Sequence, residues 1–113
     1  MEKEMTQQAQ TFDGGVTPEQ VEAWKNKHRK VYRVDIVDGA DTHIGYFKRP
    51  DFATIKAITK VAKTDEVEAG KVMFNNCWLG GSEELKEDAV LFMAVQVQLG
   101  KLVNGCMGSL KNL

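Results

Sequence analysis

The alternation of apolar and polar residues is clearest between residues 30 and 48. Apolar side chains occupy every second position of 32–36, with charged residues between them, and the run ends at a turn marked by Asp38 and Gly39. The segment 42–48 is again rich in β-branched and aromatic residues. We therefore expect an antiparallel hairpin. Because two strands alone are marginal in water, its apolar face must be covered by helices, or its open edge extended by another chain.

A helix is expected before the hairpin, and its start is well marked. Thr17 stands at the N-cap, Pro18 at the first helical position and Gln20 at the third, which is the pattern of a capping box. Residues 1–15 are polar and carry few large apolar groups, so we expect a flexible tail. The remaining residues, 16–113, are expected to form a single domain.

Helical spacing returns after the hairpin. Asp51 and Asp65 are suitable N-caps for two helices, and the glycine pair 80–81 is expected to end the second of them. Ser82 is then expected to cap a last long helix that reaches about Val103, since apolar residues recur there at spacings of three and four. The sequence thus predicts an α+β fold: an N-terminal helix, a two-stranded antiparallel hairpin and then three helices packed on it, with the helices on one side of the small sheet.

Charge narrows the choice of partners. Lys and Arg number 15 and Asp and Glu number 16, which gives a net charge of -1. Such a chain has no long-range field that would attract nucleic acid or an anionic membrane. No apolar run is long enough to cross a bilayer, and the N-terminus does not resemble a secretion signal. We therefore expect a cytoplasmic protein that binds neither nucleic acid nor membrane.

Residues capable of catalysis are few. His28 and His43 lack a neighbouring nucleophile motif, and no phosphate-binding loop or calcium-binding loop is present. Cys77 and Cys106 lack the spacing of a zinc site and are expected to be free thiols. The sequence predicts no catalytic residue, no metal site and no cofactor. A Cys–His pair would form only if the fold brought such residues together.

Two short segments, 46–50 and 75–81, place aromatic residues close to a proline or to glycines, where the backbone is expected to turn. Aromatic and Arg side chains commonly anchor protein partners, so both segments are candidate partner-binding sites. The alternative is structural: a strand end packed on the next helix, and a helix cap whose Trp closes the core. The candidate partner-binding residues are Tyr46, Phe47, Arg49, Pro50, Asn76, Trp78 and Leu79.

The apolar stripe at 92–102 has two interpretations. It can face the core of its own domain, as a single amphipathic helix in a small protein normally does. It can also serve as a seam for self-association, which would make the protein a homo-oligomer.

The segments Tyr46–Pro50 and Asn76–Gly81, followed by Glu87 and Asp88, resemble small tail assembly chaperones of tailed phages and prophages. The resemblance covers roughly residues 17–103. It implies a non-enzymatic, helix-rich cytoplasmic protein that coats the tape measure protein during tail assembly and often self-associates.

The methionines fit a chaperone that binds apolar helical stretches, because Met side chains adapt to different surfaces. They also fit an ordinary core. Two other classes of function stay open: a small regulatory or inhibitory protein of a mobile element, and a small hydrolase with an unrecognised Cys–His pair.

Overall fold

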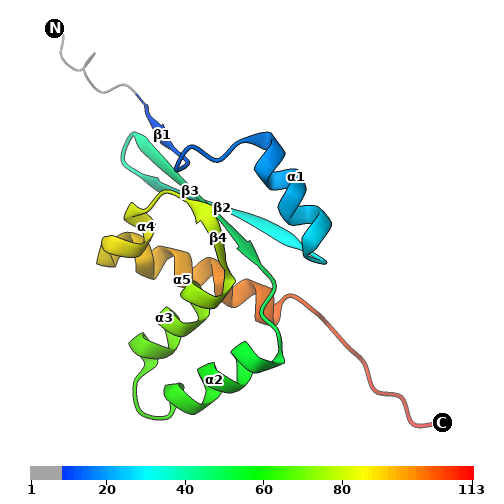
Figure 1. Cartoon of the computed structure of the whole chain (residues 1–113). Coiled ribbons are helices and arrows are strands. Elements are labelled where there is room, and N and C mark those ends of the chain that lie inside the picture. The colour runs from blue at the N-terminus through cyan, green and yellow to red at the C-terminus, as the bar shows by residue number, and fades with distance from the viewer. Residues whose placement is uncertain (1–8) are drawn as a thin grey trace, which may run out of the picture.

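The computed structural model describes residues 9–113 and has an α+β architecture with five helices and a four-stranded sheet (Figure 1). Among these residues, no helix combines the length and the apolar composition needed to span a bilayer. The elements in chain order are β1 (Thr11–Phe12), α1 (Pro18–Lys27), β2 (Val31–Asp38), β3 (Asp41–Lys48), α2 (Phe52–Ala62), α3 (Glu66–Cys77), β4 (Trp78–Gly81), α4 (Glu84–Glu87) and α5 (Ala89–Asn104).

Strand β3 is the centre of the sheet. It pairs antiparallel with β2 along its whole length, from Val31 opposite Lys48 to Asp38 opposite Asp41. This is the hairpin that the alternation predicts. Gly39 begins its two-residue loop with a φ of 62°, the left-handed value that tight hairpin turns require. The other edge of β3 is shared by β1, which is parallel to it, and β4, which is antiparallel.

The core lies between the sheet and the helices α3, α4 and α5. Phe47 of β3 is fully buried and contacts Phe74 of α3 edge to face, with ring centroids 5.3 Å apart. Helix α5 packs under β2, where Val34 and Ile36 are buried. Helix α2 packs on α3 rather than on the sheet, and in Figure 1 it lies farthest from the strands. The buried core residues form one connected cluster: Val34, Ile36, Phe47, Met73, Phe74, Cys77, Leu85, Leu91, Phe92, Val95 and Leu99.

The helix starts confirm the sequence signals. Thr17 and Gln20 form the predicted capping box, with Pro18 in the first turn. The side chains of Asp51 and Asp65 accept hydrogen bonds from backbone N–H groups in the first turns of α2 and α3. These caps act locally, which explains why sequence alone locates them.

The expected order of elements is wrong at the N-terminus, because β1 precedes α1. The tail expected for residues 1–15 overlaps this strand, and residues 1–8 lie outside the described part. Pairing with β3 is what forms β1: the Thr42 N–H donates to the Gln10 carbonyl (2.8 Å), and the Phe12 ring stacks on that of His43. A two-residue strand carries no periodicity from which it could be predicted.

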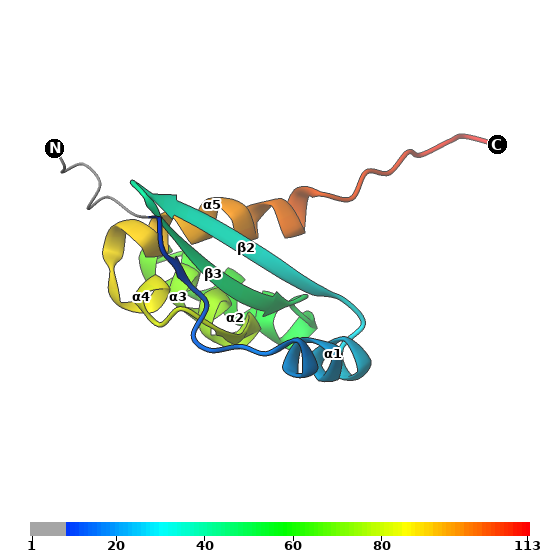
Figure 2. The same ribbon diagram turned by 90° about the horizontal axis from the view of Figure 1, so that it is seen from above.

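The expected placement of all helices on one side of the sheet is also wrong. Successive residues of a strand point to opposite faces, and Phe47 points toward α3. Its neighbour Tyr46 points the other way and contacts Trp24 of α1, with ring centroids 5.6 Å apart. Helix α1 therefore covers the face opposite the core helices, and the view from above shows it at the far side of the strands from α5 (Figure 2).

The glycine pair at 80–81 lies in β4 instead of in a helix end. Gly81 has a φ of 139°, and a Cβ on it would lie 2.3 Å from the Ile44 carbonyl oxygen. Only glycine fits so close to β3. Ser82 likewise does not cap a helix, since its hydroxyl hydrogen-bonds to His43.

The expected long last helix is divided at Asp88. Its carboxylate accepts hydrogen bonds from the backbone N–H groups of Val90 and Leu91, which starts α5 as a separate helix after the short α4. The apolar spacing runs through this break, so the pattern alone does not reveal it.

Candidate functional site

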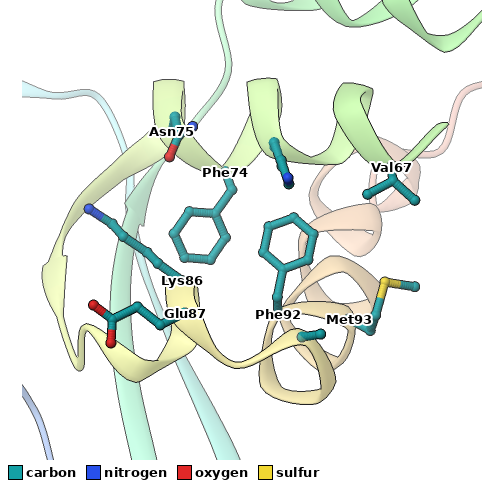
Figure 3. A pocket seen from close by; sticks show the side chains of 9 residues that line it. Val67, Phe74, Asn75, Lys86, Glu87, Phe92 and Met93 are labelled. Atoms are coloured by element: carbon teal, nitrogen blue, oxygen red, sulfur yellow. The ribbon is translucent and has the colours of Figure 1, made fainter. Parts of the chain in front are cut away.

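The main candidate site is an apolar groove between α3 and the α4–α5 segment, with a volume of about 480 Å³. Helix α3 provides one wall, and α4 and the first turns of α5 provide the other (Figure 3). Nine residues line this groove: Val67, Lys71, Phe74, Asn75, Lys86, Glu87, Ala89, Phe92 and Met93.

The floor of the groove is aromatic and belongs to the core. Phe74 and Phe92 face each other across it, with ring centroids 5.4 Å apart, and both are buried. Phe74 also stacks on Trp78 at 5.2 Å. These contacts fix the floor, because moving the ring of Phe74 or of Trp78 would disturb the packing around Phe47.

The rim of the groove exposes apolar side chains to solvent. Val67 on α3 is 56% exposed and Met93 on α5 is 55% exposed, and Figure 3 shows them at the same end of the groove. Lys86 and Glu87 lie at the other end, together with Asn75. The groove is therefore apolar at its centre and at one end, and polar at the other, which suits an amphipathic ligand.

A second hollow of about 190 Å³ extends the groove along α3 and α5. It shares Val67, Phe92 and Met93 with the groove and adds Glu66, Gly70 and Gln96. A Cβ on Gly70 would lie 2.9 Å from the Gln96 side-chain oxygen, so the glycine makes room for this amide. The Gln96 Nε2 atom is buried and has no hydrogen-bond partner among the described residues. An unpaired donor of this kind is costly in a folded chain.

The predicted site residues at 46–50 fall in different environments. Phe47 is fully buried, so it contributes to the core rather than to an accessible surface. Tyr46 is half-buried against α1. Arg49 and Pro50 are half-buried after β3, and an Arg49 guanidinium nitrogen lies 3.4 Å from the Cys106 sulfur.

The predicted site residues at 76–79 lie where α3 becomes β4. The exposed Asn76 donates a hydrogen bond from its side chain to the Val72 carbonyl (2.7 Å). Trp78 is half-buried; it stacks on Phe74, and the Lys86 ammonium lies 4.8 Å from the centre of its ring. Leu79 is half-buried in β4. Trp78 therefore joins the second segment to the groove through Phe74 and Lys86, whereas the first segment lines no part of the groove.

The groove residues Val67, Phe92 and Met93 were not among the predicted site residues. Phe92 and Met93 are consecutive on one helix, and their pattern fits a core helix as well as a binding surface. The break at Asp88, which opens space between α4 and α3, has no periodic signature. The one feature of the sequence that could have indicated the groove is the apolar Val67 within the otherwise polar stretch that begins α3.

The contacts of His43, Cys77 and Cys106 do not join a cysteine to a histidine. His43 is buried, and its Nδ1 shares a hydrogen bond with the Ser82 hydroxyl (2.8 Å) beneath the Phe12 ring. Burial raises the pKa of the Cys77 thiol to about 11, which leaves it protonated at neutral pH. Cys106 is exposed beside Arg49. Within residues 9–113 no three His, Cys, Asp or Glu side chains gather as metal ligands would.

Comparison with known proteins identifies a shared fold. No protein-family model matches the chain, and no curated protein sequence is similar to it. Among solved structures, the chain is similar to the uncharacterised protein rbstp2171 from Bacillus stearothermophilus, with a TM-score of 0.60 and 20% sequence identity. The similarity covers 81% of this chain and 99% of that one. At this level of identity the likeness concerns the fold alone.

Proposed function

We propose that the protein is a non-enzymatic binding protein that holds an apolar helical segment of another protein in the groove between α3 and α5. The observation that carries this proposal is the exposure of Val67 and Met93 at one end of the groove, beside the buried rings of Phe74 and Phe92 (Figure 3). Amphipathic helices bind proteins by laying their apolar face into a groove of this kind.

The chemistry of the rim supports a helical ligand. Met93 is flexible and polarizable, so it adapts to ligand side chains of different shape. Lys71, Lys86 and Glu87 stand beside the apolar surface, where they would meet charged residues of opposite sign on the polar face of a bound helix. A helix that is apolar on one side and carries charged residues beside that stripe is the ligand that fits both features.

The biological role that we propose is tail assembly, with the tape measure protein as the partner. It follows from the resemblance of the segments at 46–50 and 76–81 to tail assembly chaperones. A tape measure protein offers long apolar helical stretches that need cover before the tail tube forms. The groove supplies a surface on which one such stretch can be held.

The hydrolase alternative is disfavoured by specific contacts. A nucleophilic cysteine needs a base within hydrogen-bond reach and a lowered pKa. The pKa of Cys77 is instead raised by burial, and the side-chain partner of His43 is Ser82. Both members of the Ser82–His43 pair are buried, which closes them to a substrate.

The proposal is tested by affinity purification of the tagged chain from cells that assemble the phage tail. We expect the tape measure protein to co-purify. Met93→Lys should reduce its recovery roughly tenfold or more, because a bound apolar helix would bury the new charge without a partner. Met107→Lys is the matched control, since Met107 is fully exposed outside the groove and its replacement should leave recovery unchanged.

Two results would contradict the proposal. Recovery that is unaffected by Met93→Lys would remove the groove as the binding site. A stoichiometric complex with a host enzyme, without the tape measure protein, would favour the regulatory or inhibitory class instead.

A further inference from the structure

Strand β2 forms an open edge of the sheet. Within residues 9–113 it pairs with β3 alone, whereas the opposite edge of β3 is occupied by β1 and β4. Natural proteins usually blunt such edges with proline, bulges, short strands or charged side chains. The two charged side chains at the middle of β2, Arg33 and Asp35, carry opposite signs, so they do not repel a second copy as a row of like charges would. Strand β2 has eight residues, contains no proline, and pairs with β3 without a bulge. An edge of this length can accept another strand.

The backbone groups that face this open edge can be identified. The Thr42 N–H and the Ile44 carbonyl of β3 bond to the β1 and β4 side, so the alternate residues His43 and Gly45 direct their groups to β2. Their partners in β2 are Ile36 and Val34. The odd-numbered residues of β2 therefore direct their N–H and C=O groups outward, free to pair.

The sequence of β2 is complementary to itself about Val34. Arg33 and Asp35 flank this residue and point to the same face, where they form an ion pair with Nε–Oδ1 and Nη2–Oδ2 distances of 2.7 and 2.9 Å. Counting outward from Val34 in both directions matches Arg33 with Asp35, Tyr32 with Ile36, Val31 with Val37, and Lys30 with Asp38. Both charged pairs combine opposite signs.

We propose that β2 is a self-association edge, at which a second copy of this chain adds its own β2 antiparallel, with the two-fold axis at Val34. Arg33 then lies opposite the partner's Asp35, and Asp35 opposite the partner's Arg33. Opposite charges directly across antiparallel strands stabilise the pair. Val37, which is 70% exposed in the single chain, lies opposite the partner's Val31 and is covered. This pairing does not depend on the function proposed for the groove.

Charge selects this register over its neighbours. Only the odd-numbered residues of β2 direct N–H and C=O groups outward, so each must lie opposite an odd-numbered residue of the partner. Registers that place an odd-numbered residue opposite an even-numbered one cannot form these hydrogen bonds. An axis at Arg33 would place this residue opposite its own copy, and an axis at Asp35 would do the same for two carboxylates. Like charges directly opposite are destabilising. Only the axis at Val34 pairs every charge of β2 and of Lys30 with its opposite.

The strength of the association follows from its size. Two eight-residue strands form a small interface, so we expect a dissociation constant on the order of micromolar or weaker. The charges are exposed, so added salt should weaken the dimer.

Sedimentation over a concentration series tests the proposal, with the wild-type chain, Arg33→Asp and Asp35→Arg. The wild type should show a monomer–dimer equilibrium. Each single reversal places like charges opposite each other twice and should weaken the dimer roughly tenfold or more. An equimolar mixture of the two variants should restore it, because each charge then faces its opposite across the axis.

Two further variants separate edge pairing from loss of structure. Lys25→Asp breaks a similarly exposed ion pair with Glu22 on α1 and should leave the dimer unchanged. Val37→Pro removes an outward N–H without touching the β2–β3 pairing and should abolish the dimer while circular dichroism stays that of the folded chain. A wild type that remains monomeric, single reversals that dimerise normally, or a mixture that stays monomeric would each overturn the proposal.

Discussion

At the scale of single residues, Gln96 combines a structural cost with a position beside the groove. Its Nε2 atom is buried without a hydrogen-bond partner among the described residues, and its side chain rests over Gly70. Leaving a buried donor unsatisfied costs about 1–3 kcal/mol, whereas replacing it with an apolar group of similar shape removes that cost. Such a residue is retained more readily where it contributes to binding.

We expect Gln96→Met to raise the free energy of unfolding by about 1 kcal/mol, because the unsatisfied donor is removed and the volume is nearly kept. Urea denaturation measures the change. Gln98→Met is the matched control, since Gln98 lies two residues along the same helix, is half-buried, and has no buried unpaired atom. A Gln96→Met chain that is less stable than the wild type would contradict this account of the site.

Single residues also show what the sequence can reveal. The N-cap roles of Thr17, Asp51 and Asp65 were predictable, because each cap depends on residues within one helical turn. The hydrogen bond between His43 and Ser82 was not, because it joins residues 39 positions apart that only the β3–β4 region brings together.

At the scale of elements, the break between α4 and α5 shapes the groove. Asp88 accepts hydrogen bonds from the Val90 and Leu91 N–H groups at 2.9 and 3.1 Å, which lets the chain change direction between the two helices. Lys86 and Glu87 end α4 at one end of the groove, and Phe92 and Met93 follow in α5. The angle between the helices thus sets the opening into which a ligand would fit.

Replacing Asp88 by alanine should destabilise the chain by about 1 kcal/mol, the usual cost of losing an N-cap. Asp88→Asn should retain most of the stability, because the amide oxygen can still accept from the same N–H groups. Thermal unfolding of both variants gives the comparison. Equal stability of Asp88→Ala and the wild type would show that the cap does not hold the α4–α5 junction.

The elements that sequence failed to predict share a physical cause. Strand β1 exists only through its pairing with β3, and β4 is possible because Gly81 tolerates a φ of 139° against the β3 backbone. Neither depends on local propensity, so neither leaves a periodic pattern. The hairpin and the starts of α1, α2 and α3 follow from local signals and were predicted.

At the scale of the whole molecule, the two proposed surfaces use different elements. The groove is formed by α3, α4 and α5, and none of its lining residues lies in β2. The open edge belongs to β2, so the pairing of two β2 strands does not cover the groove. A dimer joined at β2 would therefore present two grooves. Variants of Arg33 should leave partner binding in each groove intact.

The candidate site was harder to predict than the fold. The sequence indicated aromatic residues at the end of β3 and at the end of α3 as candidate binding residues. The structure places Phe47 in the core and Trp78 against the groove floor. The groove itself arises from the packing of α3 on α5, which brings Val67 and Met93 together from positions 26 residues apart in the numbering. No local pattern encodes that contact.

The central claim, that the groove between α3 and α5 holds an apolar helix of a partner, is tested most directly by site-specific photo-crosslinking in cells that assemble the phage tail. A photoreactive amino acid replaces Val67 in the groove or, as the control, Phe52, an exposed apolar residue on α2. We predict a cross-link from position 67 to an apolar helical stretch of the tape measure protein and none from position 52. Equal cross-linking from both positions, or none from position 67, would contradict the account.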